Sequence, residues 1–503
     1  MNPARGETTC CLAVHAPPEA GCYIRHVPDP EPDSKPFDAP FPFWRILLEH
    51  RKWFVLFTLA ALALRLLFYC RFPHVAGDSL IYGDIAKNWL DQGIFGLSHA
   101  DGVRPTWIRL PGYPAFLAIC FKLFGREHYH AVLLVQIAID VASCFVIADL
   151  ARRTVSTRAA LWAFAVAALC PFTANYTVAP LAETLSIFFA AAALDAAVTA
   201  FRRFEEGSTV WNDWIICGVA VACGIQLRPD GGIMLAAIGL YLVWRLLRDT
   251  EHRVHWFWAG TLVLVIALAP LVPWTVRNWR QFHRFQPLAP RYASDPDEFV
   301  PSGFDRWMRT WVVDYASTEE VYWQVPGSDV DTSLLPSRAV DSDEERQQTQ
   351  AIFDDYAQSH FVGPELNQRF EQLAEQRIQR HPFRYYIGLP LLRSADMWVR
   401  PRTEMLPLNS RWWEFEDDLE DAWRATLWGC LNLVFLFAAA MGVIQGPRPL
   451  YLGMLLLFVA LRSAFLGTVE NPEPRYTLEC FPVVLLLAGA WISGWRRWNR
   501  AAV

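Results

Sequence analysis

Charged residues are scarce in this sequence of 503 residues: they make up 19% of it, against 53% hydrophobic residues. Soluble proteins average about 25% charged residues. More than half of the acidic residues stand between positions 277 and 421, yet the mean hydropathy of the whole chain is +0.17. The rest of the chain is therefore strongly apolar. This pattern excludes a single soluble domain, a disordered chain and a small disulfide scaffold, and it predicts a polytopic membrane protein with one large extramembrane insert.

The polar block at 277–421 also lacks cysteine. An extracytoplasmic domain stabilised by disulfides would carry its cysteines there. Eight of the eleven cysteines lie in or beside apolar segments, and the other three are Cys10, Cys11 and Cys22. No His or Cys cluster accompanies those three to complete a zinc site. The cysteines are therefore predicted to be packing thiols.

The first 42 residues contain nine prolines and no apolar run. A cleavable signal peptide needs an apolar core of at least about seven residues. The segment 1–42 is therefore predicted to be a disordered cytoplasmic tail.

Ten apolar segments approach the length of about 20 residues that a transmembrane helix needs. They are residues 53–70, 131–150, 159–174, 178–200, 211–227, 231–247, 256–276, 423–444, 450–468 and 476–494. A shorter stretch, 111–125, begins with two prolines and contains Lys122, which favours an interfacial or re-entrant segment.

Basic residues accumulate in cytoplasmic loops. With ten spans and both termini inside, the inner loops hold the clustered arginines: Arg152, Arg153, Arg158, Arg202, Arg203, Arg245, Arg248 and Arg253. Counting 111–125 as a span would move Arg152 and Arg153 outside. We therefore predict a multi-pass protein of the cell (inner) membrane with about ten spans.

This topology divides the chain into four parts. The tail 1–42 precedes a transmembrane module at 43–276, whose first outer loop is 71–130. An extracytoplasmic insert at 277–421 separates that module from the C-terminal transmembrane helices at 422–503. The predicted fold class is an all-α polytopic membrane protein with a large extracytoplasmic insert before the last three helices.

The first outer loop carries the most informative motif. Ile81, Ile85 and Trp89 repeat every four residues, which predicts a helix on the membrane surface that ends near Gly93. Asp78 stands at the start of this helix, where its carboxylate would serve either as a general base or simply as the helix N-cap. Asp84 would pair with Lys87 or Asn88 on the same face.

The order of several motifs resembles the start of GT-C superfamily glycosyltransferases. The shared features are Arg65 near the end of the first span, Asp78 soon after it, Arg-x-Pro-Gly-Tyr-Pro at 109–114, Leu-Ala-Glu-Thr at 181–184, and Arg475-Tyr476 before the last span. Within the superfamily, the pattern is most similar to protein O-mannosyltransferases and lipid A aminoarabinose transferases. Many members have two adjacent acidic residues where this chain has Asp78-Ser79.

This resemblance implies a GT-C-like membrane fold and an enzyme that transfers a sugar from a polyprenyl-phosphate donor to an acceptor hydroxyl on the extracytoplasmic face. The acceptor would be a lipid, a glycan or a protein. The candidate catalytic carboxylates are Asp78 and Glu183. The candidate substrate-binding residues are Tyr82, Asp84, Arg109, Tyr113, Arg228, Arg277, Arg475 and Tyr476. No metal ligand is assigned, and a divalent metal stays an open alternative.

Arginines at outer span ends oppose the orientation rule. Arg228, Arg277, Arg280 and Arg475 occupy such positions, where they would hold a carrier phosphate or snorkel to lipid headgroups. Asp140 and Asp195 fall within spans, and Asp140 is expected to pair with a neighbouring helix. His128 and His130 are expected to be solvated.

The rival functions are a polytopic transporter or flippase, a surface-polysaccharide polymerase or ligase, and a non-catalytic scaffold. A transporter predicts matching halves with broken helices near the midplane, which the sequence lacks. The insert contains Trp307, Trp311, Tyr315, Tyr322 and Trp323, which would stack on sugar rings or pack within the insert.

Overall fold

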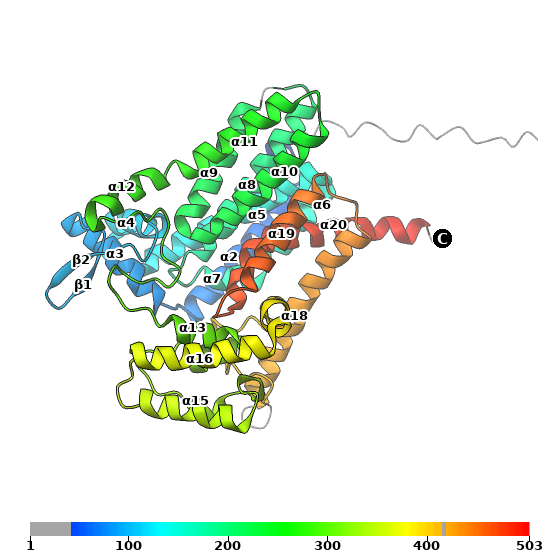
Figure 1. Ribbon diagram of the computed structural model, residues 1–503. Coiled ribbons are helices and arrows are strands. Elements are labelled where there is room, and N and C mark those ends of the chain that lie inside the picture. The colour runs from blue at the N-terminus through cyan, green and yellow to red at the C-terminus, as the bar shows by residue number, and fades with distance from the viewer. Residues whose placement is uncertain (1–41, 209, 415–418, 502–503) are drawn as a thin grey trace, which may run out of the picture. The chain divides into compact units, whose positions relative to one another are not determined.

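The computed structural model describes residues 42–208, 210–414 and 419–501, with side chains described up to Gly494. The predicted disordered tail lies outside the described residues except for Pro42, as do Cys10, Cys11 and Cys22. Helices dominate the described part, and a single two-stranded hairpin is its only sheet (Figure 1). The all-α fold class is confirmed.

Seven of the described helical segments are long and apolar enough to cross a membrane: Arg51–Arg71 (α2), Tyr129–Thr154 (α5), Glu183–Glu205 (α8), Pro229–Arg248, Arg253–Phe282, Leu419–Ile444 (α18) and Pro474–Gly494. Three of these segments combine elements: η1 (Pro229–Gly231) with α10 (Gly232–Arg248), α11 (Arg253–Leu268) with α12 (Leu271–Phe282), and η6 (Pro474–Cys480) with α20 (Phe481–Ala501). The protein is a multi-pass membrane protein.

Four shorter apolar helices are α4 (Gly112–Phe124), α6 (Thr157–Ala168), α9 (Trp211–Leu227) and α19 (Leu452–Leu466). Each of the ten predicted spans therefore coincides with a helical segment, and the number that cross the membrane stays a prediction. At about 1.5 Å per residue, the 13 residues of α4 reach about 20 Å, which is less than the hydrocarbon core of about 30 Å. This length agrees with the interfacial or re-entrant interpretation of 111–125.

Small residues let the central helices approach closely. α8 packs on α5 and α9, and α20 packs on α6 and α18, through a core rich in alanine. A Cβ added at Gly489 of α20 would lie 2.5 Å from the backbone nitrogen of Ala163 in α6, so only glycine fits there. The two helices are held together by this backbone-to-backbone approach.

Charges buried within the spans are paired. Arg65 of α2 donates a 2.6 Å hydrogen bond to Asp140 of α5, and Arg65 also bonds the carbonyl of Ala168 at the end of α6. Arg153 lies 3.2 Å from Asp195. The expectation that Asp140 pairs with a neighbouring helix is confirmed, and both aspartates have a structural role here.

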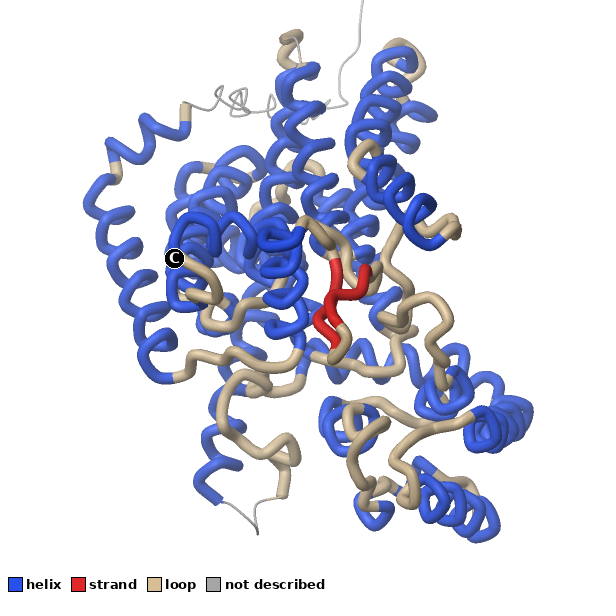
Figure 2. Tube along the Cα trace, turned by 90° about the vertical axis from the view of Figure 1, so that its left-hand side faces the viewer, coloured by secondary structure: helices blue, strands red, loops and turns tan. Residues whose placement is uncertain are grey.

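The segment between α2 and α5 forms a compact layer. α3 (Asp78–Gln92) ends at Gly93, whose φ of 70° is in the left-handed region that favours glycine. β1 (Gly96–His99) and β2 (Gly102–Pro105) then form an antiparallel hairpin, drawn in red in Figure 2. The helix predicted from Ile81, Ile85 and Trp89 is present and ends where predicted, and its place on the membrane surface stays a prediction.

The insert folds around its own apolar core. Its helical elements are α13 (Ser302–Arg309), α14 (Tyr315–Ser317), η2 (Thr318–Tyr322), η3 (Thr332–Leu334), η4 (Ser337–Ala339), α15 (Asp343–Tyr356), α16 (Pro364–Arg380), η5 (Arg384–Gly388) and α17 (Leu389–Val399). α16 packs against both α13 and α15 (Figure 1). Arg377 of α16 is fully buried and pairs with Glu345 of α15. The two remaining short helices are α1 (Phe43–Glu49) and α7 (Pro171–Tyr176).

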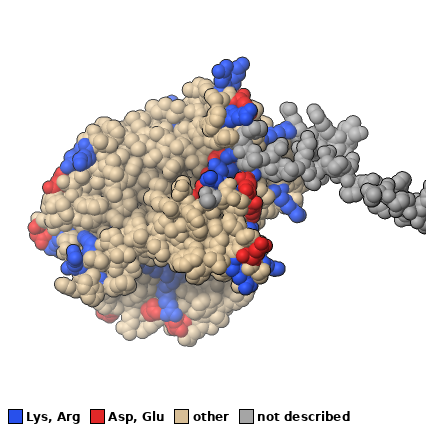
Figure 3. All heavy atoms as spheres, turned by 90° about the horizontal axis from the view of Figure 1, so that it is seen from above, with Lys and Arg blue, Asp and Glu red and all other residues tan. Residues whose placement is uncertain are grey.

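The surface over the spans is apolar. Side chains of α10 and α11 point outward, including Leu240, Trp244, Leu247, Phe257, Trp258 and Val265. The view in Figure 3 shows a broad face without charge, and charged groups gather toward its edges. This is the surface expected of helices that contact lipid. The eight described cysteines are all free. Five of them are buried, as predicted for packing thiols, whereas Cys223 is half-buried and Cys70 and Cys430 are exposed.

Candidate active site

A cavity of about 1030 Å³ lies where segments from six parts of the chain meet. Its walls come from residues 74–82 at the start of α3, residues 108–110 before α4, residues 176–183 at the start of α8, the turn between α9 and α10, the segment between α19 and η6, and the insert. All six are regions that the orientation rule predicts to lie on the same, outer side of the membrane. The structure brings these loops together around one cavity, as expected if they lie on the same side of the membrane.

Asp78 lies in the wall of this cavity at the first turn of α3. Its carboxylate accepts a 2.7 Å hydrogen bond from Arg109 and lies 3.8 Å from Arg475. The N-cap of α3 is Gly77, and no side chain caps the helix. The N-cap interpretation of Asp78 is therefore wrong, because its carboxylate is directed at arginines from other segments.

These arginines set the protonation of Asp78. Burial alone would raise the pKa of the carboxyl, but the charges of Arg109, Arg475 and Arg228 outweigh burial and lower that pKa below its usual range. Asp78 is therefore an ionised carboxylate at neutral pH. Arg109 also lies over the ring of Tyr82, 5.6 Å from its centroid, which fixes the guanidinium beside the carboxylate.

Glu183 is the second carboxylate of the cavity, at the first residue of α8. Its Oε1 accepts a 3.1 Å hydrogen bond from Arg228 and lies 3.6 Å from Arg475. Arg475 thus lies within ion-pair distance of both Asp78 and Glu183, and Arg228 and Arg475 both contact the ring of Tyr476. The chain brings together two carboxylates and three arginines that are far apart in sequence.

A second layer of charges supports Arg228. Arg462 of α19 is fully buried and pairs with Asp230 at 3.1 Å and with Glu479 at 2.8 Å. Asp230 also lies 3.1 Å from Arg228. Arg228 is therefore paired with Asp230 as well as with Glu183, and Asp230 is itself fixed by Arg462.

Four charged residues of this site were not predicted from the sequence: Arg462, Asp230, Glu473 and Glu479. Arg462 is the only arginine within the apolar stretch 450–468, and a lone arginine inside a predicted span is a signal that could have identified it. Glu473 pairs with Arg475 at 2.6 Å and accepts a hydrogen bond from Tyr476. Burial raises the pKa of Glu473, and the neighbouring arginine only partly offsets this.

Three predicted substrate-binding residues do not line the cavity. Asp84 accepts hydrogen bonds from the backbone and hydroxyl of Ser98 and lies 3.6 Å from Lys87, so it anchors the hairpin to α3. Tyr113 is fully buried and donates to Gln136 of α5. Arg277 lies within α12 and donates to the carbonyls of Thr106 and Phe95, so it ties α12 to the hairpin. These three side chains therefore connect α3, α4, α5, α12 and the hairpin to one another.

The described residues contain no group of three His, Cys, Asp or Glu side chains placed to hold a metal ion. Around Asp78, the neighbouring side chains are arginines, and the adjacent Ser79 is buried. This donor set does not fit a divalent metal. His130 instead contacts Tyr69, 3.1 Å from its hydroxyl.

The insert contributes its own wall to the cavity. Tyr315, Glu319, Tyr322 and Trp323 line it, whereas Trp307 and Trp311 are fully buried in the core of the insert. The structure thus divides the aromatic set predicted from the sequence into packing residues and cavity residues.

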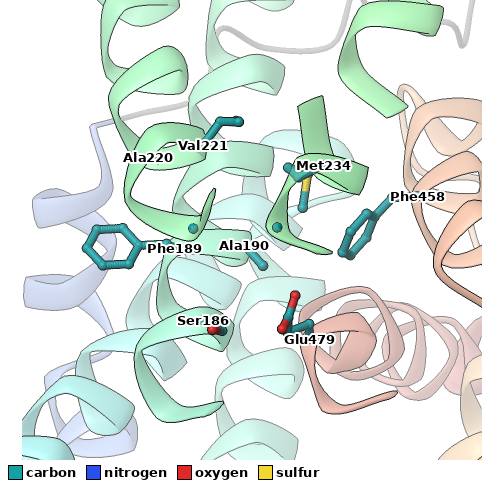
Figure 4. A pocket seen from close by; sticks show the side chains of 10 residues that line it. Ser186, Phe189, Ala190, Ala220, Val221, Met234, Phe458 and Glu479 are labelled. Carbon is teal, nitrogen blue, oxygen red and sulfur yellow. The ribbon is translucent and has the colours of Figure 1, made fainter. Parts of the chain in front are cut away.

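A narrow crevice of about 10 Å³ lies between α8, α9, α10, α19 and η6. Figure 4 shows Ser186 and Glu479 at one end of it, and Val221 and Met234 toward the other. Because Glu479 also pairs with Arg462, the crevice adjoins the second charge layer. It is large enough for about one water molecule and is otherwise apolar.

Comparison with known proteins agrees with this arrangement. Residues 104–274 match the family model described as dolichyl-phosphate-mannose-protein mannosyltransferase. The oligosaccharyltransferase AglB from Archaeoglobus fulgidus, solved with an inhibitory peptide and a dolichol-phosphate, superposes with a TM-score of 0.50 at 11% identity, covering 92% of this chain and 52% of AglB. The chain has a GT-C fold. It spans about half the length of AglB.

A second GT-C structure is ArnT from Cupriavidus metallidurans, solved with undecaprenyl phosphate. It shares 13% identity over 88% of this chain and 77% of ArnT, with a TM-score of 0.40. Curated protein sequences gave no significant match. The GT-C fold predicted from the order of motifs is confirmed, and the matched region at 104–274 includes Arg109, Glu183 and Arg228.

Proposed function

We propose that this protein is a membrane glycosyltransferase that moves a sugar from a polyprenyl-phosphate donor to an acceptor hydroxyl. The observation that carries the proposal is the cavity in which Asp78 and Glu183 lie among Arg109, Arg228 and Arg475. These are the groups that the reaction needs: a carboxylate to accept a proton and cations to hold a phosphate. The GT-C fold supports the same activity by analogy.

In this reaction the acceptor oxygen forms a bond to the anomeric carbon of the sugar. The bond between that carbon and the phosphate oxygen breaks, and its electron pair leaves with the polyprenyl phosphate. Asp78 takes the hydroxyl proton of the acceptor, and Glu183 is the alternative base. Because the departing phosphate gains negative charge, Arg228 and Arg475 stabilise it as it leaves.

In the structure, Arg228 and Arg475 are already paired with carboxylates before any phosphate binds. Arg475 contacts Asp78, Glu183 and Glu473, and Arg228 contacts Glu183 and Asp230. Such pairs keep the guanidinium groups in fixed positions before the donor binds. An incoming phosphate then competes with carboxylates for the arginines, and this competition leaves a carboxylate available to accept a proton.

The reaction is assigned to the extracytoplasmic face of the cell membrane. The support is the distribution of basic residues, which assigns all cavity-lining loops to the outer side. A cavity of about 1030 Å³ lies at the upper end of ordinary small-molecule pockets, which suits a site for a donor headgroup and an acceptor together.

The test uses purified protein in lipid vesicles supplied with radiolabelled polyprenyl-phosphate sugar and extracted envelope acceptors. Label transferred to an acceptor supports the enzyme. Label that accumulates inside the vesicles, with no covalent product, would identify a transporter or flippase instead. Arg475→Lys keeps the charge but loses the planar fork, so it should raise the donor KM, whereas the exposed Arg104→Lys should not.

A further inference from the structure

The insert presents a small aromatic and acidic surface to the cavity. This surface consists of Tyr315, Glu319, Tyr322 and Trp323, all within nine residues of sequence. Tyr315 and Trp323 are in edge contact, with ring centroids 5.6 Å apart. Trp323 keeps 44% of its surface exposed, in contrast to the fully buried Trp307 and Trp311. Its indole is therefore available to a ligand.

The local backbone explains why these side chains face the same way. Asp314 caps α14 by accepting a hydrogen bond from the backbone of Ser317. The chain then continues through a π-helical turn at Thr318–Tyr322. In a π-turn the backbone hydrogen bond spans five residues where that of an α-helix spans four, and such turns are frequent at functional sites.

Adjacent glutamates on this turn have different surroundings. Glu320 accepts two hydrogen bonds from Arg411, at 2.6 and 2.7 Å, and is fixed within the insert. Glu319 lines the cavity, and within the described chain no ion pair or side-chain hydrogen bond engages its carboxylate. Glu319 therefore offers acceptor oxygens to a ligand in the cavity that Trp323 also lines.

The chemistry of this surface fits a saccharide ring. A pyranose or furanose has a face of C–H groups, which packs on a flat aromatic ring, and a rim of hydroxyls, which donate to a carboxylate. The carboxylate of Glu319 disfavours a phosphate beside it, and the nearby Arg291 of the cavity wall is already paired with Glu470 at 2.8 Å. A polyprenyl tail would gain nothing from a desolvated carboxylate.

We propose that Trp323 and Glu319, backed by Tyr315, form a saccharide-binding subsite that the insert supplies to the cavity. This proposal rests on the proposed glycosyl transfer and assigns the insert a role in it. The arginines at the span ends hold the phosphate, and the insert holds a sugar ring. That ring belongs either to the donor or to a glycan acceptor.

The experiment measures binding to the purified full chain in nanodiscs by calorimetry. The donor probes are bare undecaprenyl phosphate and the same carrier bearing glucose, galactose, mannose or arabinose. The acceptor probes are the free disaccharides lactose, maltose and mannobiose. Trp323→Ala and Glu319→Gln are compared with Trp413→Ala and Glu320→Gln. Trp413 is an insert tryptophan that is also 44% exposed but does not line the cavity.

We expect the wild type to bind one glycosylated carrier more tightly than the bare carrier, or to bind a free disaccharide. Trp323→Ala and Glu319→Gln should weaken that sugar-dependent binding at least about tenfold, the size expected for a lost hydrogen bond to a charged group. Both control variants should retain it. An effect on the glycosylated carrier assigns the donor ring, and an effect on the disaccharide assigns the acceptor.

Two results would overturn the subsite: no sugar-dependent binding by the wild type, or full sugar-dependent binding by Trp323→Ala. Transfer by the wild type is measured in parallel. Sugar-dependent binding that needs Trp323, without transfer by any preparation, would refute the proposed function and leave the subsite standing. Transfer by the wild type, together with full sugar-dependent binding by Trp323→Ala, would refute the subsite alone.

Discussion

The guanidinium of Arg109 donates a 2.7 Å hydrogen bond to the carboxylate of Asp78, a residue 31 positions earlier in the sequence. Arg109 opens the Pro-Gly-Tyr-Pro motif before α4, and Asp78 opens α3. The tight packing of α3 on α4 brings the two together. The pair keeps the carboxylate ionised, which is the state that a general base requires.

This relationship predicts the pH dependence of transfer. The arginines lower the pKa of Asp78, so the wild-type rate should stay constant as the pH falls from 7 to about 5. Arg109→Gln removes the largest of the favourable charges, which raises the pKa of Asp78. The acid limb of the rate profile should therefore move to higher pH, as measured from kcat at saturating donor between pH 4 and 8.

The control for this shift is Arg104→Gln, which removes an exposed arginine paired with Asp101 on the hairpin of the same outer loop. Its profile should match the wild type. An acid limb that does not move in Arg109→Gln would assign the base to another group.

The buried Arg462 predicts a large effect on stability. Arg462→Met would leave Asp230 and Glu479 without their shared cation, and breaking a buried pair costs about 3–5 kcal/mol. Arg424→Gln removes an arginine paired with Glu420 and Asp421 at the surface, which is worth at most about 1 kcal/mol. Thermal unfolding of both variants in detergent tests this difference. Equal melting temperatures would mean that Arg462 does not hold the second charge layer.

The variant Arg462→Lys tests whether the group of Arg462, Asp230 and Glu479 also affects function. It retains a positive charge but cannot contact Asp230 and Glu479 with the same fork. If Arg462 positions Arg228, the donor KM should rise while the melting temperature falls only slightly. An unchanged donor KM would make Arg462 purely structural.

Asp305 in the insert makes stability depend on pH in the opposite sense to Asp78. Burial, with repulsion from Glu470, raises the pKa of Asp305 from 3.8 to about 7, despite Arg309 and Arg291. The folded state then binds more protons than the unfolded state between pH 4 and 7, so this group destabilises the protein as the pH rises through that window. Asp305→Asn should raise the melting temperature, and the gain should be larger at pH 8 than at pH 5.

The matched control for Asp305 is the exposed Asp297, which pairs with Arg284 at the surface. Asp297→Asn should change the melting temperature little at either pH. A gain for Asp305→Asn that is equal at pH 5 and pH 8 would contradict a raised pKa.

The topology can be tested with single cysteines in a background without the native cysteines. Ala100 and Ser333 are exposed in the first outer segment and in the insert, and Glu251 is exposed in the loop between α10 and α11. In intact cells an impermeant thiol reagent should label Ala100→Cys and Ser333→Cys, and Glu251→Cys should react only after lysis. Labelling of Glu251→Cys in intact cells would contradict the predicted orientation.

The sequence identified site residues best where charged side chains are rare, at the ends of apolar segments. Asp78, Glu183, Arg228 and Arg475 stand at predicted outer helix ends, and the structure brings all four to the cavity. The helix α3 also follows from the spacing of its apolar residues. These features depend on local pattern and on the orientation rule, which a single sequence contains.

The sequence was least informative about which side of an element faces the cavity. Asp84 and Tyr113 belong to the same motifs as Asp78 and Arg109, but their side chains turn to Ser98 and Gln136. Arg462 was not predicted as a site residue, because its partners Asp230 and Glu479 come from other parts of the chain. Such pairings are fixed by tertiary packing and not by spacing along the chain.

The most direct test of the account is sugar transfer by Asp78→Asn and Glu183→Gln, each with radiolabelled polyprenyl-phosphate sugar as donor. Asn keeps the shape of Asp78 but cannot accept the proton, so a base role predicts a loss of roughly 100- to 10,000-fold in transfer with normal protein levels. The exposed Asp101→Asn in the same outer loop should retain full activity. An active Asp78→Asn beside an inactive Glu183→Gln would move the base to Glu183. Normal transfer by both variants would contradict the proposed mechanism.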